Sequence, residues 1–329
     1  MPRAPRSAAA FLVALTFAAC GTGSGPGMPD DDPMMLGQPT LNASSRSNDL
    51  PSVTLDPNAF FREIMARVNA GLEVQGAEYR LVMAEWFGED AVGQTVFFFD
   101  VGNKQLGAQF VPADPRPPRG GRTNITYTID QAEGAVDGLT QAQTDAAIDR
   151  AMQTWDRETC STLPIVRVAN SGGDLGLVEF FGVPPVGPGQ GGSSAVFADV
   201  THAGWLPTGL LPAQVIGVTF TAFFTTTGGQ FTDIDNDGKV DVALREILYN
   251  DLFVWRVNGN IDIETVALHE AGHGLSQAHF GQAFLTLSND KLHFAPRAVM
   301  NAAYSGLQQR LAGTDNAGHC SIWGSWPNS

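Results

Sequence analysis

Residues 266–279 read VALHEAGHGLSQAH, and this stretch carries three of the six histidines in the 329-residue chain. On a helix, His269 and His273 lie one turn apart on the same face, so both imidazoles can reach one metal ion. Glu270 is offset by one residue, which suits it to hold a metal-bound water and to take its proton during attack on a carbonyl group. The HExxH pattern therefore predicts a zinc-binding helix that carries its own general base.

An ordinary amphipathic helix could carry this pentapeptide alone, so the third ligand matters. Catalytic zinc takes three protein ligands and leaves a fourth position open. No glutamate follows Glu270, which excludes a downstream glutamate as the third ligand. The remaining candidates are His279, His293, His319, Asp290 and Asp315. We expect His279, because it completes HExxHxxxxxH and a chain that leaves the helix after Leu275 can bring this imidazole back to the metal.

Two stretches together follow a known family pattern. HEAGHGLSQAH at 269–279 and AVMNAAY at 298–304 resemble the metzincins, zinc peptidases with HExxHxxGxxH followed by a methionine-containing turn. The resemblance covers about residues 120–325. It implies an α+β catalytic domain with a twisted mixed β-sheet, an active-site helix, a Met-turn and a C-terminal helix.

The resemblance implies that His269, His273 and His279 bind Zn²⁺. The chain departs from the family at Ser276, where metzincins usually have glycine. This position is the bend out of the helix, where a left-handed conformation is costly for a residue with a Cβ. Gly274 is available to share the turn.

Within the metzincins the chain is most similar to the matrixins and their bacterial relatives. Met300 is followed four residues later by Tyr304, as in the matrixin Met-turn. The resemblance implies that Met300 forms a hydrophobic floor under the zinc and that Tyr304 helps to wall the substrate pocket. The ending LAGTDNAGHCSIWG also resembles the matrixin C-terminal helix, with Thr314 as its N-cap and Asp315 in the first turn.

The first 19 residues are typical of a signal peptide. Arg3 and Arg6 precede an apolar run, FLVALTFAA, that is too short to span a bilayer. The run ends FAAC, which resembles the lipobox of bacterial lipoproteins, so we expect Cys20 to be acylated; simple secretion is the alternative. Residues 20–50 have the composition of a flexible linker. The predicted location is therefore the bacterial cell envelope, facing outside the cytoplasm, with a lipid anchor as the only membrane contact, or the secreted fraction.

Charge and cysteine content agree with export. The formal net charge is −15; removing residues 1–19 takes away two of 19 basic side chains, leaving 17 against 34 acidic ones, or −17. This excess of negative charge argues against nucleic acid as a partner. With Cys20 lipidated, Cys160 and Cys320 remain as an even pair in an oxidising compartment, which predicts a disulfide. The alternative is a thiolate that blocks the zinc, but no cysteine occupies a prodomain-like position.

Residues 51–115 form a small N-terminal α/β segment with its own pattern. Asp56 can cap a helix that starts at Pro57, with apolar residues at helical spacing. Strands are expected at 79–87 and 94–102, and DPRPPRGG at 114–121 is predicted to be a linker. The segment could be an inhibitory propeptide, a substrate-binding module or a structural appendage; we favour the appendage.

Residues 116–329 are predicted to form the catalytic domain. A helix capped by Thr140 and Gln143 is expected after the first strand. Gly-rich residues 182–194 are a loop without the Lys-Ser or Lys-Thr of a phosphate-binding loop. The expected strands are 124–130, 165–168, 177–181 and 217–224. Alternating helices and strands over this length favour one domain around a twisted mixed sheet.

DIDNDGKVD at 233–241 is a candidate Ca²⁺ loop. The carboxylates that could bind the ion are Asp233, Asp235, Asp237 and Asp241. Gly238 stands where a calcium loop turns sharply, but Leu244 replaces the glutamate of an EF-hand, so a two-helix EF-hand is not supported. An acidic turn between strands is the alternative. Asp199 and His202 could belong to a further metal site, although a single histidine in a loop is more often structural.

Two functions fit these observations. The first is a zinc endopeptidase that cleaves protein or peptide substrates outside the cytoplasm and acts as a monomer. The second is a catalytically inactive, surface-anchored binding or adhesion module that keeps the metzincin fold. Glu270 favours the peptidase, because a binding module does not need a general base beside an intact set of metal ligands.

Overall fold

The computed structural model describes residues 56–99, 107–170, 172–183, 191–286, 288 and 291–327. The expected signal peptide, the linker with Cys20, and the alternative ligand Asp290 lie outside these residues. Within the described part of the chain, no helix has the length and apolar character needed to cross a membrane.

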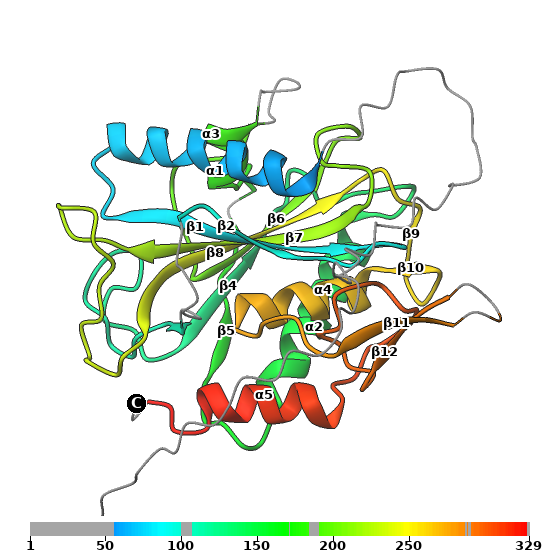
Figure 1. Cartoon of the computed structure of the whole chain (residues 1–329). Helices are drawn as coiled ribbons and strands as arrows, with labels where there is room; N and C mark the ends of the chain where they lie inside the picture. Colours follow the sequence, from blue (N-terminus) through cyan, green and yellow to red (C-terminus); the bar gives the residue numbers. More distant parts are fainter. Residues whose placement is uncertain are drawn as a thin grey trace, which may run out of the picture. The chain divides into compact units, whose positions relative to one another are not determined.

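One mixed sheet of eight strands organises the described residues (Figure 1). Its path runs β2-β1-β7-β8-β6-β4-β5, and β3 pairs with β8 beside this path. The strands are β1 (Tyr79–Gly88), β2 (Thr95–Phe97), β3 (Ala108–Gln109), β4 (Ile125–Ile129), β5 (Ile165–Arg167), β6 (Val200–Leu206), β7 (Val215–Phe224) and β8 (Val240–Asn250). Strands β8, β6, β4 and β5 run parallel to one another. Strand β7 is antiparallel to β8, β1 is antiparallel to β7, and β2 is antiparallel to β1. The sheet is therefore mixed, as the sequence predicts.

The fold combines this mixed sheet with helices on both of its faces and is of the α+β class (Figure 1). Helices α1 (Pro57–Val74) and α3 (Leu177–Gly182) lie on one face, and α2 (Gln141–Asp156), α4 (Ile263–Gly274) and α5 (Gly313–Trp323) lie on the other. Each face has its own hydrophobic core. Two small sheets complete the fold: β9 (Trp255–Arg256) with β10 (Ile261–Asp262), and β11 (Gln282–Thr286) with β12 (Lys291–Ala295).

The first two helices begin where their sequences predict. The carboxylate of Asp56 accepts the N–H of Asn58 at 3.1 Å, and Pro57 occupies the first helical position. At α2, the N–H of Thr140 donates to Oε1 of Gln143 at 2.9 Å. The apolar stripe of α2 is buried against α4, with Trp155 fully inside.

Two strands and one helix differ from the expectation. Strands β6 and β8 are missing from the predicted set, and residues 177–181, predicted as a strand, form α3 instead. The reason lies on β8: both carboxylate oxygens of Glu246 accept N–H groups, one from Leu177 at 2.6 Å and one from Val178 at 2.9 Å. These bonds satisfy the free N–H groups of a first helical turn, so the apolar run LVEFF becomes a helix.

The N-terminal segment contributes to the central sheet. Strand β1 pairs with β7 along its whole length, as expected for 79–87, and β2 pairs with β1; of the strand expected at 94–102, only residues 95–97 form one within the described residues. Residues 114–121 are not an exposed linker. Arg119 is fully buried and pairs with Asp199 at 2.9 Å, while Arg116 joins Asp114 to Asp241 at 2.7 Å each.

Candidate metal centre

Helix α4 carries the HExxH residues through the core on one side of the sheet. Asp262 caps the helix, because its carboxylate accepts the N–H of Thr265 at 2.8 Å. His269 and His273 follow one turn apart and are both fully buried. The helix thus fixes two imidazoles on one face, as the spacing predicts.

The end of α4 turns the chain back towards these imidazoles. The N–H of Ser276 donates to the carbonyl of His273 at 3.0 Å, and the next N–H donates to the carbonyl of Gly272 at 2.9 Å. This pair of bonds is the Schellman arrangement, in which the residue after the cap is left-handed. Ser276 has φ +68°, whereas Gly274 stays within α4, so the serine and not the glycine takes the left-handed conformation.

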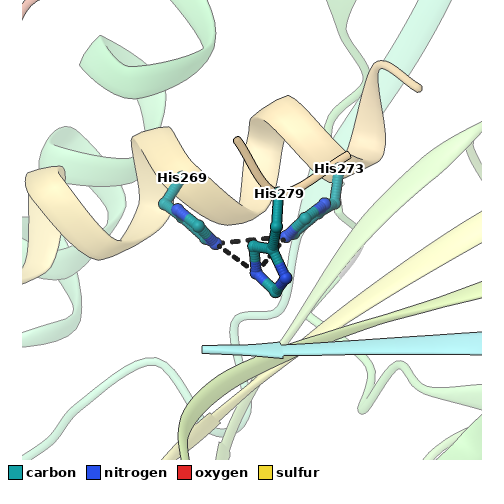
Figure 2. Close-up of side chains that lie close together, drawn as sticks. All are labelled: His269, His273 and His279. Atoms are coloured by element: carbon teal, nitrogen blue, oxygen red, sulfur yellow. Dashed lines mark hydrogen bonds between the residues drawn. The ribbon is translucent and has the colours of Figure 1, made fainter. Parts of the chain in front are cut away.

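Three imidazole nitrogens converge after this turn (Figure 2). The Nε2 atom of His273 lies 3.1 Å from that of His269 and 3.2 Å from that of His279; the remaining Nε2 pair is 3.3 Å apart. A tetrahedral zinc ion about 2.0–2.1 Å from each nitrogen would separate its ligands by about 3.3–3.4 Å. The triangle is therefore of the size that such an ion requires.

The opposite ring nitrogens show which nitrogen carries the proton. Nδ1 of His269 lies 2.7 Å from the carbonyl oxygen of Val299, and Nδ1 of His273 lies 2.7 Å from that of Gln277. A carbonyl oxygen only accepts, so both Nδ1 atoms donate, and each of these rings presents a lone pair at Nε2 when it is neutral. Lone pairs that face each other at this distance repel, and a cation between them removes the repulsion. The donor set fits zinc.

The side chain of Glu270 projects from α4 towards β7. It is fully buried, and its Oε2 accepts the hydroxyl of Thr219 at 2.6 Å. No described residue donates a hydrogen bond to its Oε1. Gly217 leaves room for that oxygen, since a methyl group there would lie 2.8 Å from it. Burial raises the pKa of Glu270 to about 8, against the opposing effects of His273 and of the Thr219 hydrogen bond.

Strand β1 supplies two side chains to the centre that the sequence does not indicate. The ring of Phe87 stacks on His269, with centroids 3.8 Å apart. Oε1 of Glu85 lies 3.3 Å from Nδ1 of His273, and both β1 side chains are buried. Only the pairing of β1 with β7 brings these residues beside a helix almost two hundred positions later, so no local pattern marks them.

The three histidines differ in their pKa values. Burial lowers the pKa of His269 well below its usual value, and lowers that of His279 to about 3. Burial acts in the same direction at His273, but the carboxylates of Glu85 and Glu270 and the carbonyl of Gln277 together outweigh it, and the pKa of His273 is raised. His269 and His279 are therefore neutral at physiological pH, which is the form that binds a metal.

The Met-turn, residues 298–304, packs directly beneath α4. Met300 is buried, and a methyl group at Gly272 would overlap its Sδ atom. The hydroxyl of Tyr304 accepts the N–H of Asp262 at 3.1 Å, and its ring meets Phe87 edge-on at 6.2 Å. Burial raises the pKa of Tyr304 to about 12, so it stays protonated.

A cavity of about 430 Å³ opens beside the centre on the side of α5. Its lining includes Gln277, His279, Phe280, Met300, Asp315 and Gly318. His279 is the one histidine of the triangle that is partly exposed, so this cavity gives the centre an approach from solvent.

The alternative third ligands have other environments. His293 stacks on Phe284 in the β11–β12 hairpin, and His319 lies against Trp155. The carboxylate of Asp315 accepts the N–H groups of Val299 at 2.9 Å and Met300 at 3.0 Å. Asp315 thus holds the Met-turn in place. The helix cap differs from the expectation: the N-cap of α5 is Ala312, not Thr314.

The acidic loop brings three of its four expected carboxylates together. Donor oxygens of Asp233, Asp235 and Asp237 lie within 4.8 Å of one another. Asp241 is not part of this group, because it is buried and pairs with Arg116 at 2.7 Å. Hydrogen bonds within the loop, from the N–H groups of Asp237 and Gly238 to Asp233, also support the acidic-turn alternative.

Asp199 and His202 do not form a second metal site. Asp199 pairs with Arg119 and Arg122, whereas Nδ1 of His202 lies 2.8 Å from the hydroxyl of Tyr249. His202 is on β6 rather than in a loop, and burial lowers its pKa to about 3. It is a neutral core histidine.

A disulfide joins Cys160, just after α2, to Cys320 on α5. The thiolate-switch alternative needs a free cysteine near the histidines, and these two cysteines are bonded to each other. The disulfide ties the C-terminal helix to the core helix whose Trp155 donates to the carbonyl of Leu268 on α4.

Comparison of the sequence with models of known protein families gives no match, and a search of curated proteins gives none. The geometry of the centre is therefore the basis for the function proposed below.

Proposed function

We propose that this chain is a zinc-dependent endopeptidase of the metzincin type, closest to the matrixins, in which His269, His273 and His279 bind the metal. The observation that carries the proposal is the triangle of Nε2 atoms, 3.1–3.3 Å apart, with two of the rings fixed through Nδ1. The adjacent Glu270 and the Met-turn beneath α4 support the same assignment.

The chain's own residues would divide the work of peptide hydrolysis. Zinc held by the three histidines supplies Lewis-acid activation of a water molecule and of the scissile carbonyl. Glu270 takes the proton from the attacking water through its free Oε1 and delivers it to the leaving amine. Thr219 keeps the other carboxylate oxygen in place at 2.6 Å, which fixes the direction of proton transfer. The cavity beside His279 is the side from which a peptide would approach.

One observation favours the alternative of a non-catalytic binding module. His269, Glu270 and His273 are fully buried, and β1 covers them with Phe87 and Glu85. A peptidase needs a substrate carbonyl at the metal, so a centre that stays covered would hold the fold together without turnover. Activity measurements on the full chain separate the two functions.

The test is cleavage of a peptide library by the zinc-loaded chain, compared with Glu270→Gln. We expect the wild type to cleave internal peptide bonds and Glu270→Gln to lose at least about 100-fold in kcat, because the base is removed while the ligands remain. The exposed Glu73→Gln is the control with the same change of charge. A zinc-loaded wild type without activity would favour the binding module, and full activity in Glu270→Gln would refute the role of Glu270.

The proposal also includes export and anchoring. The acylation of Cys20 and the location at the cell envelope rest on the FAAC sequence. We expect the mature chain to fractionate with membranes and Cys20→Ala to be released. Intact mass of an unmodified Cys20 in mature protein would exclude the anchor.

A further inference from the structure

A second group of acidic side chains lies on the other face of the sheet from the histidines. Glu246 shares a strand face with Leu244 and Leu248, which belong to the core under α1. Around it are carboxylates from the segment after β4 and from the start of α3. The group consists of Asp130, Glu133, Asp174, Glu179 and Glu246.

Glycines let these segments approach one another. A methyl group at Gly204, where β6 is irregular and φ is +94°, would lie 2.8 Å from Cβ of Glu133. A methyl group at Gly176 would lie 3.4 Å from Cβ of Ala203, 3.4 Å from Cβ of Glu179 and 3.5 Å from a carboxylate oxygen of Glu246. The acidic side chains therefore meet around residues 203 and 204.

Two members of the group have their oxygens satisfied by backbone. Asp130 accepts the N–H groups of Ala132, Glu133 and Leu175. Glu246 accepts those of the first two residues of α3. These two carboxylates hold the loops in place.

The other three carboxylates have oxygens without a hydrogen-bond partner. Glu133 is 7% exposed, and neither of its carboxylate oxygens accepts a hydrogen bond from any described residue. Glu179 is 2% exposed with Oε2 unpartnered, and the half-buried Asp174 has Oδ1 unpartnered. A buried carboxylate without hydrogen bonds or a counter-charge destabilises the folded state.

No described basic side chain pairs with this group of carboxylates. Among the described residues, none of the five carboxylates forms an ion pair with Lys, Arg or His. Burial, with mutual repulsion added, raises the pKa of Glu179 to about 8 and that of Glu133 to about 7.

We propose that Glu133, Asp174 and Glu179 bind a divalent cation of the calcium type. Unpartnered carboxylate oxygens are the ligands that a hard cation prefers, and Ca²⁺ accepts irregular arrangements of six to eight oxygens. Two groups among the described residues have three donor atoms within 4.8 Å of one another: the zinc-type histidines and the aspartates of the 233–237 loop. The donor oxygens of Glu133, Asp174 and Glu179 do not come this close together in the structure, so binding requires their side chains to rotate towards one another. Asp174, at the rim, gives the ion its entry from solvent.

The experiment uses the zinc-loaded chain with the acidic loop disabled by Asp233→Asn and Asp235→Asn. This parent protein is freed of calcium on a chelating resin, resupplied with zinc, and titrated with CaCl₂ at pH 7.5. Native mass spectrometry counts bound calcium, and thermal unfolding reports stabilisation. We expect one calcium per chain and a Tm increase of about 5 °C at about a hundredfold excess over Kd.

Paired charge-removing variants locate the ion. Glu133→Gln with Glu179→Gln should weaken calcium binding at least about 100-fold, and without calcium this variant should be no less stable than the parent because repulsion is relieved. Glu73→Gln with Glu78→Gln removes the same charge from exposed positions and should leave the response unchanged.

Two results would overturn the proposal. In the first, the parent binds no calcium and its Tm does not respond, whatever happens to the variants; protons alone would then neutralise the group. In the second, the Glu133→Gln, Glu179→Gln variant binds calcium as the parent does. If that variant does not fold, a parent protein that binds no calcium would still refute the proposal.

Discussion

Replacing Ser276 with glycine should stabilise the protein, which is the reverse of most core-adjacent substitutions. Ser276 has φ +68° in the turn that ends α4. For a residue with a Cβ, this left-handed conformation destabilises the folded state by about 1–2 kcal/mol. Glycine avoids this strain, but its greater loss of backbone entropy on folding costs about 0.5–1 kcal/mol. The difference is a gain of about 0.5–1 kcal/mol in the free energy of unfolding.

Thermal unfolding of the zinc-loaded chain measures this gain. A domain of this size shifts its Tm by about 2 °C for each kcal/mol, so Ser276→Gly should unfold about 1–2 °C higher. Ser276→Ala is the matched control: it keeps the Cβ and removes a hydroxyl that no described residue engages, so it measures the effect of the hydroxyl alone, and its Tm should stay below that of Ser276→Gly. Destabilisation by Ser276→Gly, or an equal gain from Ser276→Ala, would refute strain at this Cβ as the cost of the turn.

Two further predictions concern packing and pH. Gly272→Ala places a methyl group on the sulfur of the Met-turn and should cost about 1–3 kcal/mol or more in urea unfolding; unchanged stability would show that the methionine has room to move. Glu133 and Glu179 have pKa values of about 7 and 8, above the unfolded value, so the folded state binds more protons. Without calcium, stability should therefore be highest below the unfolded pKa. It should fall by about 1.4 kcal/mol per pH unit for each proton that only the folded state still holds, as pH rises from about 5 to the folded pKa values of about 7 and 8, and level off above them; a flat or rising profile between about pH 5 and 7 contradicts this.

Local sequence patterns predict those parts of the fold whose cause is local. The caps at Asp56 and Thr140 are set by residues two and three positions away, and both helices start where expected. The apolar run at 177–181 has no such local cause. It is helical because Glu246, almost seventy residues later, accepts its first N–H groups, which a sequence pattern cannot show.

The same distinction holds at the metal centre. The separation of His269, His273 and His279 follows from one helix and one turn, so their convergence could be predicted from spacing. Glu85 and Phe87 reach the centre only through the pairing of β1 with β7, and their sequence reads as an ordinary strand. Asp241 was expected beside its loop partners, but Arg116, from a stretch predicted to be a linker, holds it elsewhere.

The zinc content of the purified chain is the most direct test of the histidine centre. Elemental analysis by mass spectrometry should give about one zinc per wild-type chain, and His279→Ala should lose it because two protein ligands remain. His293→Ala is the matched control and should keep its zinc, as should Glu270→Gln. Full zinc in His279→Ala, or none in a folded wild-type chain supplied with zinc, would contradict the three-histidine centre on which the proposed function rests.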